Sequence, residues 1–183
     1  LVNEQWAALE TGMTSSSPRV NDLAIFDGDL YVAGQFSQVS GQAAANLIGW
    51  DLANGEWLPS PPGTNGEINT LLVADDGQNP GNDQLYVGGS FTSDGPTSAS
   101  YLAALQNNSW SALNQPQPIT GVIQDLAFYD NRVFVVGENQ ALVSYTPASG
   151  NWSSSLGFKG AALIASSTGL YLSGQQDVGA AVT

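Results

Sequence analysis

One short apolar segment that ends in glycine occurs four times along the chain. The copies are LYVAGQF around Gly34, LYVGGSF around Gly89, VFVVGEN around Gly137 and LYLSGQQ around Gly174. Apolar residues in this pattern, stopped by glycine, are typical of a β-strand that reaches a turn or a close backbone contact. Self-similarity at intervals of a few tens of residues indicates one structural unit built several times, and this constrains the fold more than any single motif.

Each copy lies second in a series of apolar stretches. The stretch before it is VNDLAIFD, INTLLVAD, IQDLAFYD or, more loosely, AALIASS, and Asp-Gly pairs such as Asp27-Gly28 supply hairpin turns. A third stretch follows as NLIGWDL, YLAALQN, ALVSYTP or GAAVT. A fourth stretch carries Trp57, Trp110 or Trp152. The order predicts a unit of four antiparallel strands.

A four-stranded antiparallel unit of this kind is typical of a β-propeller blade. We therefore predict an all-β chain forming a single β-propeller domain or propeller segment over residues 1–183, with about four blades at 20–58, 68–113, 122–156 and 161–183. NEQWAALETG resembles the tryptophan strands, so residues 3–12, with Trp6, are expected to complete the last blade. Two arrangements stay open: the termini close the propeller, or the chain is cut from a larger one.

The repeated glycines and tryptophans are expected to be structural. No lysine and no helix follow the glycines, so close backbone approach is favoured over a phosphate-binding loop. The repeated tryptophans are expected to pack between blades. Trp50 differs, because Leu105 and Tyr145 occupy the same place in the neighbouring repeats. Core packing is favoured for it as well, and a solvent-facing aromatic on a binding face is the alternative.

The charge balance excludes several partners. Three basic residues, Arg19, Arg132 and Lys159, stand against sixteen acidic ones, and the net charge is −13. Such a chain repels phosphate backbones and anionic lipid headgroups, so we expect no nucleic-acid partner and no direct membrane contact. With no His and no Cys, this chain also lacks Ser-His-Asp systems, thiol chemistry and the usual zinc ligands.

Acidic residues gather in the predicted first hairpin turns, which blade geometry places on one face. The turn chemistry of Asp and Asn explains them, and a binding face for a cationic partner is the sharper interpretation. Calcium is a further alternative, because DDGQNPGND supplies several oxygens, but the spacing fails the EF-hand pattern and no cofactor is predicted. The residues concerned are Asp27, Asp29, Asp75, Asp76, Asp83 and Asp130, with Asn79 and Asn82 beside them.

Paired carboxylates could perform glycoside hydrolysis on such a scaffold. Asp22 and Asp125 occupy equivalent positions in two first strands. A glycosidase needs two carboxyl groups about 5 to 10 Å apart, whereas an active-site pair is normally an exception to a repeat. The equivalence favours a structural role, and no catalytic residue is predicted.

Two N-x-S sequons occur at equivalent tryptophan-strand turns. They begin at Asn107 and Asn151. Such sequons are acceptors for N-linked glycans in exported proteins. Together with the scarcity of lysine they favour an extracellular or cell-surface protein.

The composite pattern VNDLAxxDGDLYVAGQF, GxxAANLIGWD and GEWLP resembles the repeats of fungal cortical marker proteins for cell polarity, which are similar to kelch-type propellers. The resemblance is strongest over residues 20–57 and 68–113. It implies a glycosylated surface protein whose ectodomain of propeller repeats marks sites of polarised growth through partner proteins. Copper-radical oxidases share the kelch scaffold, but their metal centre needs His and Cys, which are absent here.

The function predicted from these observations is a non-catalytic extracellular β-propeller module that presents loops for protein or glycan binding. Its faces would be the acidic hairpin turns and the loops SQVSGQAAA and TSDGPTSAS. Two alternatives remain. One is a carboxylate-dependent carbohydrate-active enzyme, and the other is an assembly element that pairs through exposed blade edges, with the remainder of a parent propeller as its partner.

Overall fold

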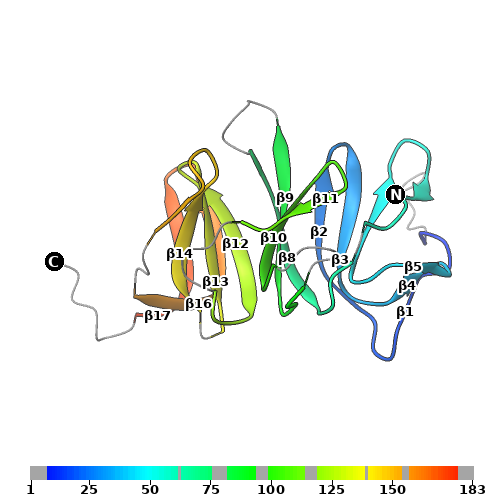
Figure 1. The fold of residues 1–183 in the computed structure, drawn as a ribbon, viewed down its shortest axis with the longest axis horizontal. Coiled ribbons are helices and arrows are strands. Elements are labelled where there is room, and N and C mark those ends of the chain that lie inside the picture. The colour runs from blue at the N-terminus through cyan, green and yellow to red at the C-terminus, as the bar shows by residue number, and fades with distance from the viewer. Residues whose placement is uncertain are drawn as a thin grey trace.

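The computed structural model describes residues 8–61, 63–75, 82–93, 99–113, 119–138, 140–153 and 157–176. These residues form antiparallel β-sheets and no helix, which confirms the all-β prediction. The sheets lie side by side in one row and follow one another in chain order (Figure 1). The repeat seen in the sequence is therefore a repeat of sheets.

Sheet 1 is a four-stranded meander in the order β2-β3-β6-β7. Its strands are β2 (Arg19–Phe26), β3 (Asp29–Gln35), β6 (Leu47–Asp51) and β7 (Glu56–Trp57). A small sheet of β1 (Met13–Thr14), β4 (Gln38–Val39) and β5 (Gln42–Ala43) lies beside it. The segment SQVSGQAAA was predicted as an open loop but contains the β4–β5 hairpin. Its apolar residues Val39 and Ala44 are fully buried, which holds the segment against sheet 1.

Sheets 2 and 3 repeat this meander. Sheet 2 contains β8 (Ile68–Asp75), β9 (Asp83–Gly89), β10 (Leu102–Gln106) and β11 (Ser109–Ser111). Sheet 3 contains β12 (Ile123–Tyr129), β13 (Arg132–Gly137), β14 (Gln140–Thr146) and β15 (Asn151–Trp152). The last unit is a long hairpin, hairpin 4, of β16 (Phe158–Ser166) and β17 (Gly169–Gln176). It joins sheet 3 through one β14–β16 residue pair, Ala141 with Lys159.

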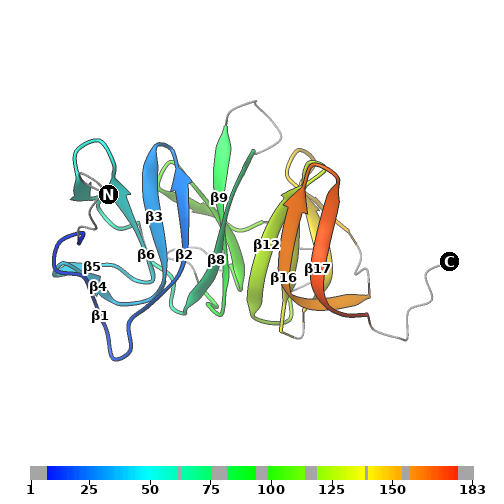
Figure 2. The ribbon, with the colours of Figure 1, turned by 180° about the vertical axis from the view of Figure 1, so that it is seen from behind.

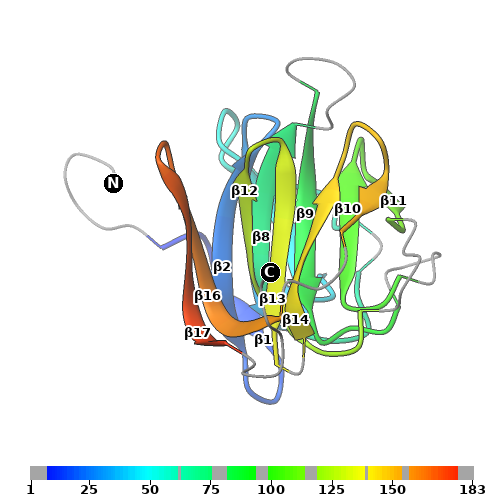
Figure 3. The same cartoon turned by 90° about the vertical axis from the view of Figure 1, so that its left-hand side faces the viewer.

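The core consists of the layers between neighbouring units. The first strands β2, β8, β12 and β16 lie next to one another in sequence order, and they gather on one side when the row is viewed end-on (Figure 3). Trp110 packs in the layer between sheets 1 and 2, and Trp152 in the layer between sheets 2 and 3. This confirms that two of the repeated tryptophans pack between units, whereas Trp57 packs under the small sheet.

The turn chemistry sets the positions of the hairpins. Asp27 and Gly28 both have positive φ, at 53° and 86°. Asn107-Asn108 and Asp130-Asn131 also have both residues at positive φ. Two successive positive-φ residues are what a tight hairpin between twisted strands requires, and Asp, Asn and Gly tolerate them best. These turns all emerge on the same side of the row, the upper side in Figure 1.

A β-bulge recurs near the start of every first strand. The register shifts between Val20 and Asp22 in sheet 1 and at the equivalent place in the other three units. There the chain presses a carbonyl against the facing glycine, so that a Cβ on that glycine would collide with it. The pairs are Gly34 with Arg19, Gly89 with Glu67, Gly137 with Val122 and Gly174 with Lys159. Close backbone approach therefore explains the repeated glycine.

The two ends of the row are different. Residues 3–12 were predicted to complete the last unit. Residues 3–7 of this segment, Trp6 included, lie outside the described residues, as does GAAVT. The strand that follows them, β1, pairs with β4 beside sheet 1. Hairpin 4 lies at the opposite end of the row (Figure 2).

Candidate functional site

Asp22 and Asp125, the candidate carboxylate pair, bind backbone N–H groups of neighbouring units. Asp22 Oδ2 accepts from the N–H of Leu71 in sheet 2 at 2.7 Å. Asp125 Oδ2 accepts from the N–H of Leu163 in hairpin 4 at 2.6 Å. β8 is an edge strand of sheet 2, and β16 pairs with β14 at one residue pair near its start, so N–H groups on the outer sides of both strands need acceptors. The two carboxylates supply them between sheets.

The aspartate is present in alternate repeats only. Asp22, Thr70, Asp125 and Ala162 occupy the same register position after the bulge. The second oxygens of Asp22 and Asp125 accept from the next N–H in their own strands, those of Leu23 and Leu126, at 2.8 Å each. Each aspartate thus accepts one hydrogen bond from its own repeat and one from the next.

Asparagines add a second bridge between sheets. Asn21 Nδ2 donates to the carbonyl of Ile68, and Asn69 Nδ2 donates to the carbonyl of Ile123, both at 2.8 Å. Each asparagine is the extra residue of its bulge, where the strand has no ladder partner for it. The bulge therefore directs this side chain across to the next sheet.

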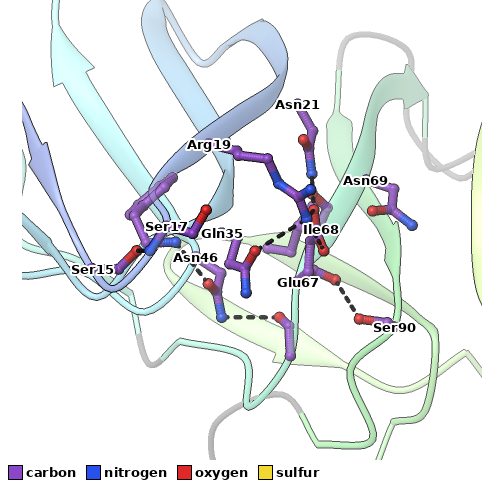
Figure 4. A network of polar contacts seen from close by, with 12 residues as sticks. Ser15, Ser17, Arg19, Asn21, Gln35, Asn46, Glu67, Ile68, Asn69 and Ser90 are labelled. Atoms are coloured by element: carbon purple, nitrogen blue, oxygen red, sulfur yellow. Dashed lines mark hydrogen bonds and ion pairs between the residues drawn. The ribbon is translucent and has the colours of Figure 1, made fainter.

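An ionic cluster joins sheets 1 and 2 on the side of the row opposite the hairpin turns (Figure 4). Arg19 Nη2 donates to both oxygens of Glu67, at 2.7 and 2.8 Å, and to Gln35 Oε1 at 3.1 Å. Asn21 Nδ2 also donates to Glu67 Oε1 at 2.7 Å. This cluster was not predicted from the sequence. The opposite charges of Arg19 and Glu67, at the same position of adjacent repeats, are the signal that could have indicated it.

The predicted acidic residues lie where the hairpin turns emerge, which we call the tip face: turns 27–28, 52–55, 107–108, 130–131 and 147–150. Asp27 and Asp130 are exposed turn residues, and Asp29 begins β3. Asp75 and Asp83 face each other across the β8–β9 ladder. Asp76 and Asn79 lie outside the described residues.

Sheets 1 and 2 enclose a small polar pocket at the tip face. Its volume is about 130 Å³, and it is lined by Phe26, Asp27, Asn82, Asp83, Gln106 and Asn107. Asp27 and Asp83 come from different repeats, so only the packing of the two sheets brings them together. Carboxylate and amide oxygens in one pocket can accept hydrogen bonds from an ammonium group or from sugar hydroxyls.

Two titratable groups near the tip face have shifted pKa values. Burial, and then the charges of Asp29 and Asp27, raise the pKa of Tyr31 above its ordinary value. The backbone N–H and side-chain amide of Asn54 hold the pKa of Asp51 below its ordinary value, with a further N–H from Ala53. Asp51 therefore stabilises the turn that follows it by accepting these hydrogen bonds.

Trp50 does not stand free. It is half-buried and packs edge-to-face on Trp57, with ring centres 4.9 Å apart and planes at 75°. The two tryptophans are also paired across the β6–β7 ladder. Trp50 can offer only part of its ring to a ligand.

Both sequon asparagines are exposed. Asn107 lies in a tight turn and lines the polar pocket, and Asn151 begins β15. The hydroxyl of Ser153, the third residue of the second sequon, accepts from the N–H of Ser144 at 2.8 Å.

The described ranges contain no group of three or more His, Cys, Asp or Glu side chains suited to hold a metal ion. No helix there has the length and apolarity needed to cross a bilayer.

Comparisons with known proteins show the fold alone. No protein-family model matches the chain, and no curated protein matches it. Among solved structures, the crystal structure of the computationally designed Ika4 protein is similar, with a TM-score of 0.60 and 13% identity. The match covers 93% of this chain and 100% of the designed one. The likeness supports a shared arrangement of β-sheets.

Proposed function

We propose that this chain is a non-catalytic, extracellular β-propeller module that binds a partner through its tip face. The propeller assignment rests on consecutive four-stranded meanders whose first strands neighbour one another, as blades do around an axis. The non-catalytic assignment is supported by Asp22 and Asp125, whose oxygens are engaged by backbone N–H groups in different layers. The alternative of a carbohydrate-active enzyme has no comparable support.

The observation that carries the binding role is the polar pocket between sheets 1 and 2. Asp27 and Asp83 bring two carboxylates to its wall, and the amide side chains of Asn82, Gln106 and Asn107 complete it. The side chain of Gln106 also donates to the carbonyl of Asp83 at 3.2 Å, which holds the wall in place. A wall of acceptors with a net negative charge suits a donor with positive charge.

A cationic protein segment is therefore the ligand class that the tip face fits best. The net charge of −13 adds long-range attraction for such a partner. A glycan is the second candidate, because the pocket's amide side chains suit sugar hydroxyls. Duplex DNA is not expected to bind, since its phosphates would be repelled.

The proposed cell-surface location agrees with the exposed sequons. A glycan on Asn107 would stand at the rim of the pocket, so glycosylation and ligand binding there would compete. Expression through a secretory pathway, followed by mass measurement before and after glycosidase treatment, tests use of Asn107 and Asn151 separately. The resemblance to cortical markers adds the marking of polarised growth sites as the proposed biological setting.

The binding role is tested with a lysine-rich peptide and with a panel of neutral oligosaccharides as probes. We expect peptide binding that weakens as salt rises, and weakens further in Asp27→Asn with Asp83→Asn. Glu138→Gln is the matched control, because this exposed carboxylate follows β13 at the end away from the turns. Equal loss in the control, or no loss in the double variant, would contradict a site at the tip face.

A further inference from the structure

The first strand of sheet 1 exposes an apolar surface that the other sheets bury. Val20 is 47% exposed, whereas its repeat equivalents Ile68 and Ile123 are 0% exposed. Leu23 is 55% exposed, whereas Leu71 and Leu126 are 8% and 6% exposed. In sheets 2 and 3 these positions pack on the preceding sheet. We call Val20, Leu23 and Ile25 the first end face.

Hairpin 4 exposes the complementary surface at the other end of the row. Tyr171 is 56% exposed, whereas its equivalents Tyr86 and Phe134 are 0% and 8% exposed and pack on the following unit. Ile164 beside it is 67% exposed. We call Ile164 and Tyr171 the last end face. The two end faces thus correspond to the two surfaces that pack together between neighbouring units inside the chain.

The shape of the first end face suits a hairpin. The outer part of sheet 1, with Val32 and Ile48, packs under the small sheet of β1, β4 and β5. The inner part, β2 and the start of β3, stays open. A groove of about 490 Å³ runs where the two parts meet, lined by Val20, Leu23 and Leu30 on the inner side and by Met13, Val32 and Trp57 on the covered side. The described part of the fourth unit has two strands, enough to cover the inner part.

Hydrogen bonding also selects the fourth unit as the one that precedes sheet 1. The N–H of Leu23 is held by Asp22 of its own strand, as the N–H of Leu126 is held by Asp125. Sheet 2, the unit before Leu126, has Thr70 at the position of the aspartate and so supplies no carboxylate to that N–H. Hairpin 4 has Ala162 at this position and likewise supplies no carboxylate. A unit with aspartate there would bring a second negative charge to an N–H already bonded.

We propose that hairpin 4 of a second copy of this chain docks on the first end face. The layer would continue the interface already formed between sheets 1 and 2 and between sheets 2 and 3. Within one chain the two end faces lie at opposite ends of the row (Figures 1 and 2). A second copy offers both faces, so one head-to-tail contact buries the first end face of one chain and the last end face of the other. A second such contact between the same two chains closes a ring and buries all four faces.

The first test is the mass in solution of the full chain by light scattering over a range of concentrations. We expect an assembly of at least twice 19.0 kDa that dissociates on dilution. Leu23→Lys and Ile164→Glu, each alone, are expected to weaken it by at least about 30-fold, because each buries an unpaired charge at the centre of the interface. Leu52→Lys is the control, since Leu52 is 52% exposed in a turn away from both faces.

The decisive measurement mixes the two variants. Leu23→Lys chains and Ile164→Glu chains should assemble together, because one interface then has both wild-type faces and the other pairs Lys with Glu. A larger head-to-tail assembly abolished by the same variants would also support the proposal. A single-chain mass at every concentration, an unchanged assembly in either variant alone, or no recovery on mixing would overturn it. Unchanged circular dichroism shows that the variants fold.

Discussion

Replacing Asp125 with asparagine is expected to lower the free energy of unfolding by about 2 kcal/mol, because a buried N–H group loses its acceptor. The two oxygens of Asp125 accept from the N–H groups of Leu163 and Leu126, at 2.6 and 2.8 Å. Both leucines are buried. Asparagine has one oxygen, so its NH₂ group must face one of these donors, whichever way the side chain turns.

The same change at Asp22 is expected to cost about 1 kcal/mol or less, because only one of its donors lies in a buried residue. The asparagine oxygen can keep the bond to the N–H of Leu71, which is 8% exposed. The NH₂ group then faces Leu23, which is 55% exposed in the single chain and whose N–H can bind water. Two equivalent aspartates are thus predicted to differ.

Urea unfolding of the monomeric chain measures both costs, and native-state hydrogen exchange at Leu126 and Leu163 locates the effect. Asp130→Asn is the control, because Asp130 is an exposed turn residue with φ of 48° that asparagine tolerates. The reasoning is refuted if Asp125→Asn costs no more than Asp22→Asn. It is also refuted if both leucine amides keep their wild-type protection.

Three further changes test other parts of the structure. Gly137→Ala should lower the free energy of unfolding by about 1 to 3 kcal/mol, because the new Cβ would meet a backbone carbonyl. Gly169→Ala is its control and should change urea unfolding little, because a Cβ there meets open space. Trp110→Ala should cost about 3 to 5 kcal/mol in the same assay, since it empties part of the layer between sheets 1 and 2. The raised pKa of Tyr31 means that the folded chain keeps this proton longer than the unfolded chain, so stability should fall as pH rises through and above the ordinary value of 10.0. Asp29→Asn should lower that pKa, as followed by absorbance; an unchanged pKa would contradict the charge effect.

The hydrogen-bond bridges solve a problem that the row of sheets creates. Each sheet begins with an edge strand, and unpaired edges invite association with other chains. Asp22 and Asn21 satisfy the edge of β8 from the side, without strand pairing. Neighbouring sheets can therefore pack face to face while these edge groups keep hydrogen-bond partners. At the two exposed end faces no neighbouring described unit packs on the sheet, so the face-to-face packing ends there.

Local pattern was enough to predict the strands, because strand, turn and glycine signals act within a few residues of one another. The alternation around LYVAGQF and the Asp27-Gly28 pair predicted the first hairpin with its turn. Repeat equivalence also predicted a structural role for Gly34 and for Trp110. The β4–β5 hairpin was missed, since two-residue strands are too short to show a period.

Which side chains meet across sheets was decided only by the tertiary structure. Asp22 and Asp125 were recognised as equivalent, but the sequence does not contain the distance from either one to the N–H of a leucine some forty to fifty residues away. Likewise, Val20 and Ile68 occupy the same repeat position. Ile68 is buried because a sheet precedes it, and Val20 is exposed because no described sheet packs on it. The sequence determined the repeating unit through local backbone preferences, whereas the packing of units determined which surfaces remain free to bind.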